Sequence, residues 1–175
     1  MKKKLPINYT SRQAVMDDLP VIHCLEEKKS LHYSGVPGFS LERLRNEYET
    51  PGFDVNKSVH LVENQQDKLV GLVEVWEHSD PPVYPYVWIA VDPDLENRGI
   101  EDYLMGWAGE RALQVIGRVD PDLRVAIRAH TDHKIESVVK VLKSAGLGQI
   151  RHGFRMRIDM EGEPDAPVWP EGISI

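Results

Sequence analysis

The segment from Tyr86 to Ile116 constrains the fold more than any other part of the sequence. It opens with YVWIAV at 86–91, an apolar run too short for a typical helix and rich in β-branched and aromatic residues, which predicts a buried strand. A polar turn with a single glycine, Gly99, follows, and residues 101–116 carry apolar side chains at helical spacing. A buried strand joined by a short turn to a helix predicts a sheet with helices packed on it.

The rest of the chain supplies the other elements that such a sheet needs. Alternating apolar patterns and turn residues predict strands at 7–15, 58–64, 68–77, 123–130 and 149–160. Capping signals and helical spacing predict helices at 16–31, 41–49 and 132–146. A hairpin beside alternating strands and helices predicts an α+β fold, in which a central mixed sheet carries helices on both faces as an α/β/α sandwich.

Composition and charge exclude several classes of protein. The formal net charge of −7 argues against a nucleic-acid-binding protein, because such proteins cluster lysine and arginine to neutralise phosphates. No apolar stretch approaches the roughly 20 residues that span a bilayer, so no membrane segment is expected. Cys24 is the only cysteine, which rules out an intrachain disulfide and favours a cytoplasmic protein. We expect Cys24 to be a small core residue on the first helix.

The chain divides by composition into a domain and a tail. Residues 1–160 carry all the predicted strands and helices and are expected to form one domain. Residues 161–175 are rich in proline, glycine and acidic residues, which is typical of a linker, and their last residues, EGISI, resemble the start of another strand. We therefore expect 161–175 to be a linker that leads into a second domain.

The turn that contains Gly99 is a candidate anion site. A helix begins with unpaired backbone N–H groups and the positive end of its dipole, so a diphosphate can bind there without a lysine. Gly99 would allow a close backbone approach or a positive φ, and Arg98 could add positive charge. The alternative is that Gly99 only serves a tight turn between strand and helix. The glycine by itself does not favour one interpretation over the other.

The stretch IAVDPDLENRGIEDYLMGWAGERA resembles the acyl-CoA-binding core of the GNAT N-acetyltransferase family, and the order of elements over residues 7 to about 160 is similar to that fold. The resemblance implies an enzyme that transfers an acetyl group from acetyl-CoA to an amine of a small molecule or protein. It also implies that strand 123–130 diverges from strand 86–91 to admit the cofactor. The residues that it implies for acetyl-CoA are Ile89, Ala90 and Val91 along the pantetheine, and Glu96, Asn97, Arg98, Gly99, Ile100 and Glu101 around the pyrophosphate.

Several positions depart from the family pattern. The signature Q/R-x-x-G-x-G/A has Glu96 at its first position and Glu101 at its last. The family's tyrosine acid corresponds to Leu142, and its glutamate base falls at Pro85 or Tyr86. These departures leave a second hypothesis open, a non-catalytic GNAT domain that serves as a CoA-binding or scaffold module in a tandem protein.

Two other residues are candidates for the catalytic role. Glu74 lies in the middle of a predicted strand, where its carboxylate faces either the cleft or a solvated side of the sheet. His130 lies at the end of a parallel strand, where α/β proteins place their sites. The pair of histidines in HTDH at 130–133 lacks a further set of ligands, so no metal site is predicted. Tyr33 lies in a predicted loop, which the resemblance implies would line the acceptor side; the alternative is a turn at the surface.

The tail also bears on possible partners. The residues PVWPEGISI resemble the junction of tandem GNAT proteins, so this chain is similar to the first half of such a protein. The resemblance implies a second GNAT domain or a homodimer as a partner, in addition to an amine acceptor.

Overall fold

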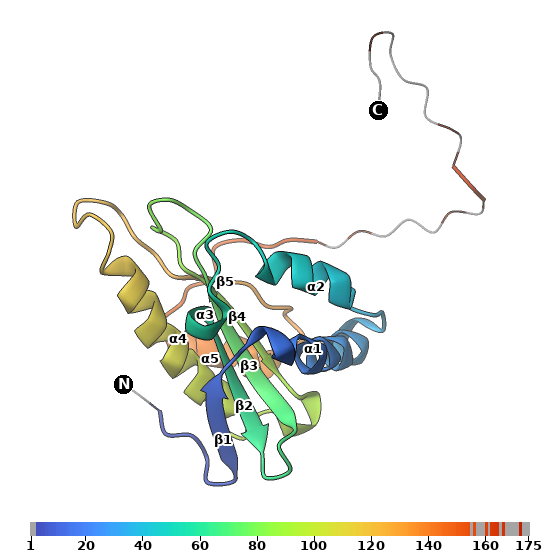
Figure 1. The fold of residues 1–175 in the computed structure, drawn as a ribbon, viewed down its shortest axis with the longest axis horizontal. Coiled ribbons are helices and arrows are strands. Elements are labelled where there is room, and N and C mark those ends of the chain that lie inside the picture. Colours follow the sequence, from blue (N-terminus) through green and yellow to red (C-terminus); the bar gives the residue numbers. More distant parts are fainter. Residues whose placement is uncertain are drawn as a thin grey trace.

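The computed structural model describes residues 3–154, 156, 160, 162–164, 166 and 172. The sheet has five strands in the spatial order β1-β2-β3-β4-β5 (Figure 1). Their bounds are Tyr9–Gln13 for β1, Val59–Asn64 for β2, Leu69–Trp76 for β3, Tyr86–Val91 for β4 and Arg128–Ala129 for β5. Strands β1 to β4 pair antiparallel, whereas β4 and β5 pair parallel, so the sheet is mixed as the sequence predicts.

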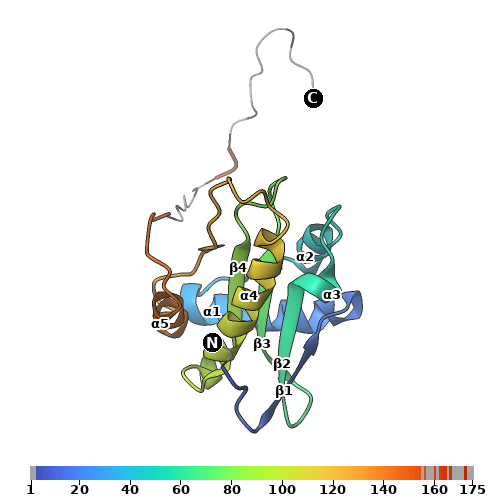
Figure 2. The same cartoon turned by 90° about the vertical axis from the view of Figure 1, so that its left-hand side faces the viewer.

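Helices cover both faces of the sheet (Figures 1 and 2). The α-helices are α1 (Leu19–Ser34), α2 (Leu41–Tyr48), α3 (Val55–Ser58), α4 (Ile100–Ile116) and α5 (Glu136–Ser144), and the 3₁₀ turns are η1 (Met16–Asp18) and η2 (Pro93–Leu95). Helices α1 and α2 pack on one face, and α4 and α5 pack on the other. The α+β sandwich is therefore confirmed.

Strand β3 separates two apolar cores because successive side chains of a strand point to opposite faces. Val73 and Val75 pack with α4 and α5, whereas Leu72 and Trp76 pack with α1 and α2. All of β3 is buried, as expected for the central strand of a sheet that helices cover on both sides.

Local signals fix the ends of several helices as predicted. The Ser40 side chain accepts a hydrogen bond from the Arg43 amide and caps the start of α2. Gly146, with φ 86°, follows the end of α5 in the left-handed conformation that ends many helices. Helix α1 runs on to Ser34 instead of stopping at 31, and it ends at Gly35, with φ 71°. Tyr33 therefore lies on the last turn of a helix and not in a loop.

Two predicted strands differ from the structure. The strand predicted at 123–130 is reduced to Arg128–Ala129, and residues 123–127 are irregular. Residues 149–154 of the strand predicted at 149–160 lie in irregular structure with the side chain of Ile150 exposed, and most of 155–160 lies outside the described residues. In both cases the alternation of the sequence is compatible with a strand, but a strand also needs a neighbour to pair with.

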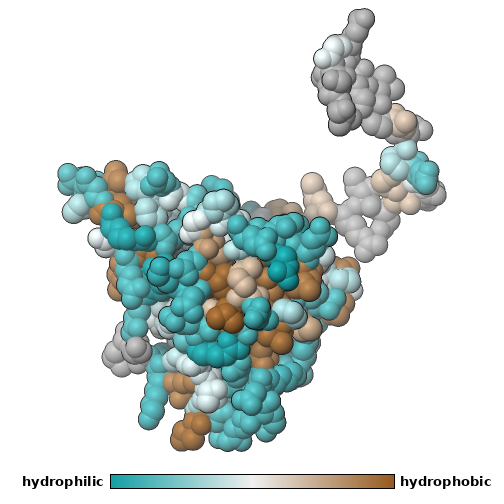
Figure 3. Space-filling model, in the orientation of Figure 1, coloured by the Kyte–Doolittle hydropathy of each residue, from teal (hydrophilic) through white to brown (hydrophobic). Residues whose placement is uncertain are grey.

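The surface also corrects one sequence-based expectation. Cys24 is exposed and is not a core residue, because the buried side of α1 is formed by neighbouring positions such as Ile22 and Leu25. The face seen in Figure 3 is largely hydrophilic, with apolar side chains gathered near its centre. Among the described residues, the helices are all too short or too polar to cross a membrane.

Candidate functional site

Strands β4 and β5 diverge soon after they meet. Their register pairs only Tyr86 with Arg128 and Val87 with Ala129, so the remaining residues of β4 have no strand partner on that side. The Asp92 amide donates to the Val70 carbonyl on the opposite side, 2.8 Å away. Because backbone direction alternates along a strand, the N–H groups of Ile89 and Val91 point toward the opening. The opening therefore presents unpaired backbone groups to any extended ligand.

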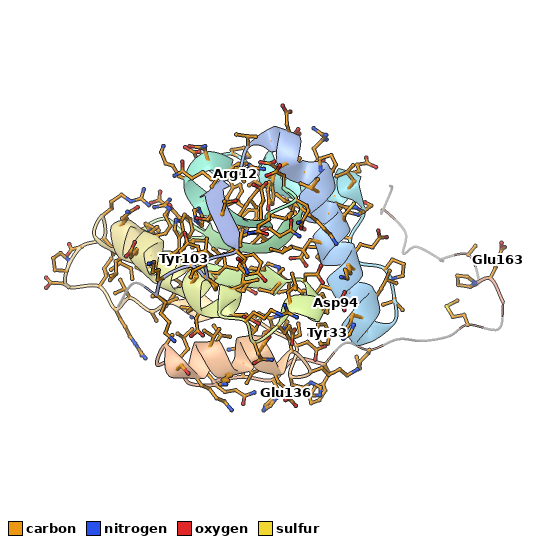
Figure 4. The ribbon with its side chains drawn as sticks, turned by 90° about the horizontal axis from the view of Figure 1, so that it is seen from below. Arg12, Tyr33, Asp94, Tyr103, Glu136 and Glu163 are labelled. Atoms are coloured by element: carbon orange, nitrogen blue, oxygen red, sulfur yellow. The ribbon has the colours of Figure 1, made fainter. Side chains whose placement is uncertain are left out.

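Side chains from both sides meet across the opening, starting directly after the last paired residues of β4 and β5. The rings of Trp88 and His130 stack with centroids 6.1 Å apart. The Lys134 ammonium donates to the backbone carbonyl of Tyr33, 3.1 Å away, and so connects the segment after β5 to the end of α1. Figure 4 shows Tyr33 and Asp94 where the end of α1 approaches the loop that follows β4.

The loop between β4 and α4 takes two left-handed residues in a short space. Asn97 has φ 59° and Gly99 has φ 87°. Only the second requires glycine, since asparagine tolerates this conformation better than most residues. Helix α4 begins directly after Gly99, and no side chain caps it among the described residues. The first amides of α4 are therefore free to bind an anion.

The base of the loop is held by an ion-pair cluster. Lys28 of α1 contacts both Asp92 and Asp94, and the Asp92 carboxylate also accepts a hydrogen bond from the Asp94 amide, 3.1 Å away. The Lys28 ammonium keeps the pKa of Asp94 below its ordinary value. These contacts fix the loop against α1, so that α4 starts at a defined place.

Two carboxylates line the same loop. Glu101 is 3% exposed, lies in the first turn of α4 and accepts a hydrogen bond from the Asn97 amide, 2.9 Å away. Glu96 accepts a hydrogen bond from the Tyr33 hydroxyl. Burial, followed by that contact with Glu96, raises the pKa of Tyr33, so its hydroxyl stays protonated. Glu101 thus satisfies one of the amides that an anionic ligand would otherwise use.

The structure brings the predicted cofactor residues into one continuous path. Ile89, Ala90 and Val91 form the end of β4 beside the opening, and residues 96–101 lead from it into α4. Arg98 is exposed on this path. The predicted residues therefore lie next to one another along the end of β4 and the start of α4.

Glu74 lies elsewhere than the sequence suggested. It faces neither the opening nor solvent but is 6% exposed under α1 and α2. Its carboxylate accepts hydrogen bonds from the Tyr48 hydroxyl and from the Trp76 indole, the latter at 2.6 Å. Burial raises the pKa of Glu74 to about 7, while the two donors oppose this shift. Strand alternation assigns a face to Glu74, but only the packing of α2 shows that this face is covered.

A second, partly buried cluster lies between Glu74 and the opening, and no pattern in the sequence indicated it. The Trp88 indole donates to Glu26, 2.6 Å away, and the Lys29 ammonium lies 4.1 Å from the centroid of the Trp88 ring. Lys29 also pairs with Glu26 at 3.0 Å. Both belong to a run of charged residues in α1, and such a run is typical of a solvent-exposed helix face. Trp88 is directly opposite Glu74 in the register of β3 and β4.

His130 lies at the rim of the opening and is exposed. Neighbouring Asp132 contacts His133, 3.2 Å away, and accepts a hydrogen bond from the Lys134 amide. Within the part of the chain that the structure describes, no three histidine, cysteine or acidic residues are placed to hold a metal ion.

Comparisons with known proteins identify the fold. No family model matches the sequence, and no curated protein matches it. Among solved structures, a GCN5-related N-acetyltransferase from Sphaerobacter thermophilus has a TM-score of 0.74 at 21% identity, over 97% of this chain. The chain spans only 52% of the length of that protein.

Two further structures carry ligands. The protein yncA from Salmonella typhimurium, solved with its cofactor acetyl-CoA, has a TM-score of 0.62 at 14% identity, over 79% of each chain. Spermidine N-acetyltransferase from Vibrio cholerae, in complex with CoA and spermine, has a TM-score of 0.59 at 21% identity, over 86% of this chain and 88% of that one. Together with the mixed sheet and its divergent β4–β5 edge, these similarities show that the chain has the fold of the GNAT N-acetyltransferases.

Proposed function

We propose that this protein is an N-acetyltransferase that moves an acetyl group from acetyl-CoA to an amine of a small molecule or protein. The observation that carries the proposal is the opening between β4 and β5, which leads directly to the uncapped start of α4. Structures of similar fold that were solved with acetyl-CoA, or with CoA and spermine, support both the co-substrate and an amine acceptor.

Acetyl-CoA fits the backbone of this site. The N–H groups of Ile89 and Val91 lack a strand partner and are suited to the amide groups of a pantetheine arm. The amides after Gly99 are suited to the diphosphate. Bound there, acetyl-CoA supplies the activated acyl group, and the chain positions it.

The transfer also requires proton movement. A protonated amine must lose a proton before its nitrogen can attack, and the departing thiolate must gain one. We assign the proton-accepting role to His130, which is exposed at the rim of the opening. Glu74 is a positioning residue in this proposal, since both of its carboxylate oxygens are occupied by Tyr48 and Trp76.

A second candidate function rests on Glu101. Its carboxylate already occupies the Asn97 amide and lies at the positive end of α4. A diphosphate would have to compete with this charge. A non-catalytic domain that binds CoA weakly, and that serves as a scaffold in a tandem protein, is therefore the alternative.

We further propose that residues 1–160 form the acyltransferase domain and that 161–175 link it to a second GNAT domain in a cytoplasmic protein. The exposed apolar side chains of Ile150, Phe154, Met156 and Met160 offer a surface for that domain, whereas a homodimer is the other outcome. The proposal draws support from the Sphaerobacter protein, of which this chain spans about half. Light scattering distinguishes docking of a second domain from a homodimer. A dimer of this chain at micromolar concentration contradicts the tandem arrangement.

The first experiment measures CoA binding by calorimetry in the wild type and in Gly99→Val. Gly99 has φ 87°, and a β-branched residue there both strains the backbone and crowds the diphosphate. We expect micromolar binding by the wild type and no measurable binding by the variant. Release of thiol from acetyl-CoA with a panel of amines then separates the enzyme from the scaffold.

Gly52→Val provides the matched control. Gly52 has φ 90°, and a β-carbon at this position would have no neighbouring atom within 4 Å, so the substitution imposes a similar backbone strain away from the loop. Both variants should lose about 1–2 kcal/mol of stability, but only Gly99→Val should lose CoA binding. Equal CoA affinity in the wild type and Gly99→Val would show that the diphosphate site has been misplaced.

A further inference from the structure

Lys29 is a buried cation beside the opening. Only 7% of this residue is exposed, although it belongs to the charged run of α1. A lysine is rarely buried unless its ammonium is paired, and this one pairs with Glu26 at 3.0 Å. The ammonium also lies 4.1 Å from the centroid of the Trp88 ring, and the face of such a ring attracts cations. A carboxylate and an aromatic face together bind an ammonium ion, so Lys29 fills a cation-binding place with its own side chain.

Trp88 lies where the acyl end of acetyl-CoA is expected. It directly follows Val87, the last residue of β4 that pairs with β5. The proposed cofactor path begins at the start of α4, which takes the diphosphate, and runs back along Val91 and Ile89. The thioester therefore lies at the far end of this path, next to Trp88. His130, the proposed proton acceptor, stacks on the same ring.

The side of β4 that faces α1 is the polar approach to this end of the path. On the opposite face, Val87 and Ile89 pack into the apolar core under α4 and α5. On the α1 face, the neighbours of Trp88 are polar, and the Glu26 side chain keeps 23% of its surface exposed. Because an amine loses less hydration beside polar groups than in an apolar core, the acceptor is expected to enter on the α1 side.

Each carboxylate oxygen of this cluster already accepts a hydrogen bond. One oxygen of Glu26 accepts from the Trp88 indole, 2.6 Å away, and the other accepts from the Lys29 ammonium, 3.0 Å away. The hydroxyl and the indole described above occupy both oxygens of Glu74. Lys29 and Glu26 thus balance each other in charge. A second ammonium that entered with the acceptor would meet a positive charge already in place.

We propose that Lys29 sets the acceptor selectivity of this site, an inference that rests on the function proposed above. Its ammonium occupies the place that a second positive charge of the acceptor would otherwise take, so the site accepts monoamines and rejects diamines. Like charges repel strongly where water is largely excluded, and a diamine could enter only by displacing Lys29 from Glu26 and Trp88. The reacting nitrogen is neutral when it attacks, so Lys29 does not exclude it.

The test pairs each monoamine of the amine panel with the diamine of the same carbon chain, such as butylamine with putrescine. Release of thiol from acetyl-CoA gives kcat/KM for both. The wild type should prefer the monoamine by at least about tenfold, as expected for one charge-assisted contact. Lys29→Met removes the charge and leaves Glu26 and the Trp88 ring free, so it should shift the ratio at least about tenfold toward the diamine. Lys29→Arg keeps a positive charge and should retain the wild-type preference.

Lys57→Met is the matched control. It removes the same charge from α3, where the Lys57 side chain is 71% exposed and pairs with Asp54. It should leave the ratio unchanged. If Lys29→Met lowers both rates equally, Lys29 has only a structural role and the proposal is overturned.

The wild type provides a second check that does not depend on any variant. If it acetylates amines but accepts putrescine as readily as butylamine, Lys29 does not set selectivity, although the proposed function stands. If no amine of the panel is acetylated, the proposed function fails and this inference fails with it.

Discussion

The two edges of β4 differ sharply. Toward β3, every residue of β4 has a partner, from Gly71 opposite Val91 to Trp76 opposite Tyr86. Toward β5, pairing covers two positions and then stops, although β4 continues to Val91. A strand in the middle of a sheet thus behaves as an interior strand on one side and as an edge on the other.

This difference separates the side of β4 that contributes to the stability of the fold from the side that is available to bind a ligand. Unpaired backbone groups near a core are costly, and native proteins satisfy nearly all of them. The β3 side of β4 is closed by regular pairing, with Ile100 and Leu104 fully buried beneath it. The β5 side leaves backbone donors available, as expected of an edge that an extended ligand completes.

The largest effect should come from shortening one apolar side chain on each side of β4 and comparing the losses of stability. Leu72 is fully buried in β3, and Leu72→Ala should lower the free energy of unfolding by about 2–5 kcal/mol through lost burial and a cavity. Ile127 precedes β5 and is only partly buried, so Ile127→Ala should cost about 1 kcal/mol or less. Chemical denaturation measures both, and comparable losses would contradict the proposed contrast between the two edges.

A smaller effect concerns pH and the buried carboxyl on the closed side. The folded-state pKa of Glu74 is about 7, above its ordinary value of 4.5. The folded state therefore holds this proton more tightly than the unfolded state, so its stabilising contribution is complete below pH 4.5 and is lost as pH rises to about 7. The wild type should lose about 2–3 kcal/mol of its free energy of unfolding between these pH values, and Glu74→Gln should abolish this pH-dependent loss.

Denaturant midpoints at pH 5 and pH 8 measure this difference. Tyr48→Phe serves as the comparison, because the Tyr48 hydroxyl hydrogen bond lowers the pKa of Glu74 and its removal should raise that pKa further. An identical pH dependence in the wild type and Glu74→Gln would show that Glu74 does not titrate in this range.

The smallest effect should be seen by hydrogen exchange on the open side of β4. The amides of Ile89 and Val91 point toward the opening, whereas those of Trp88 and Ala90 point toward β3. Without ligand, the first pair should exchange faster than the second, and saturating CoA should slow the first pair alone. Exchange of Ile89 and Val91 that CoA leaves unchanged would count against pantetheine binding along β4.

Much of the fold could be predicted because its signals are local. The pattern YVWIAV identified β4, and the Ser40 cap located the start of α2. Gly99 was expected to allow either a close backbone approach or a positive φ, and it has a positive φ. These features depend on residue type and short-range geometry, which the sequence states directly.

The site itself was only partly predictable. Residues 89–91 and 96–101 are adjacent in sequence, so their path into α4 followed from the motif. Other features depend on segments that are far apart in the sequence. Tyr48 covers Glu74, and Lys3 contacts Asp102. The burial of the Ser137 hydroxyl without a partner among the described residues likewise results from tertiary packing. No periodicity reports such contacts.

The sequence alone determined the order of most of the elements, the strand–turn–helix unit and the place of Gly99, because these depend on neighbouring residues. Only the tertiary structure decided that β5 would shorten to Arg128–Ala129 and leave an opening. It also decided that Glu101 would occupy an amide of the loop and that Lys3 would pair with Asp102 at the start of α4. The physical reason is that pairing, burial and charge compensation are properties of surfaces that meet in space, whatever their separation along the chain.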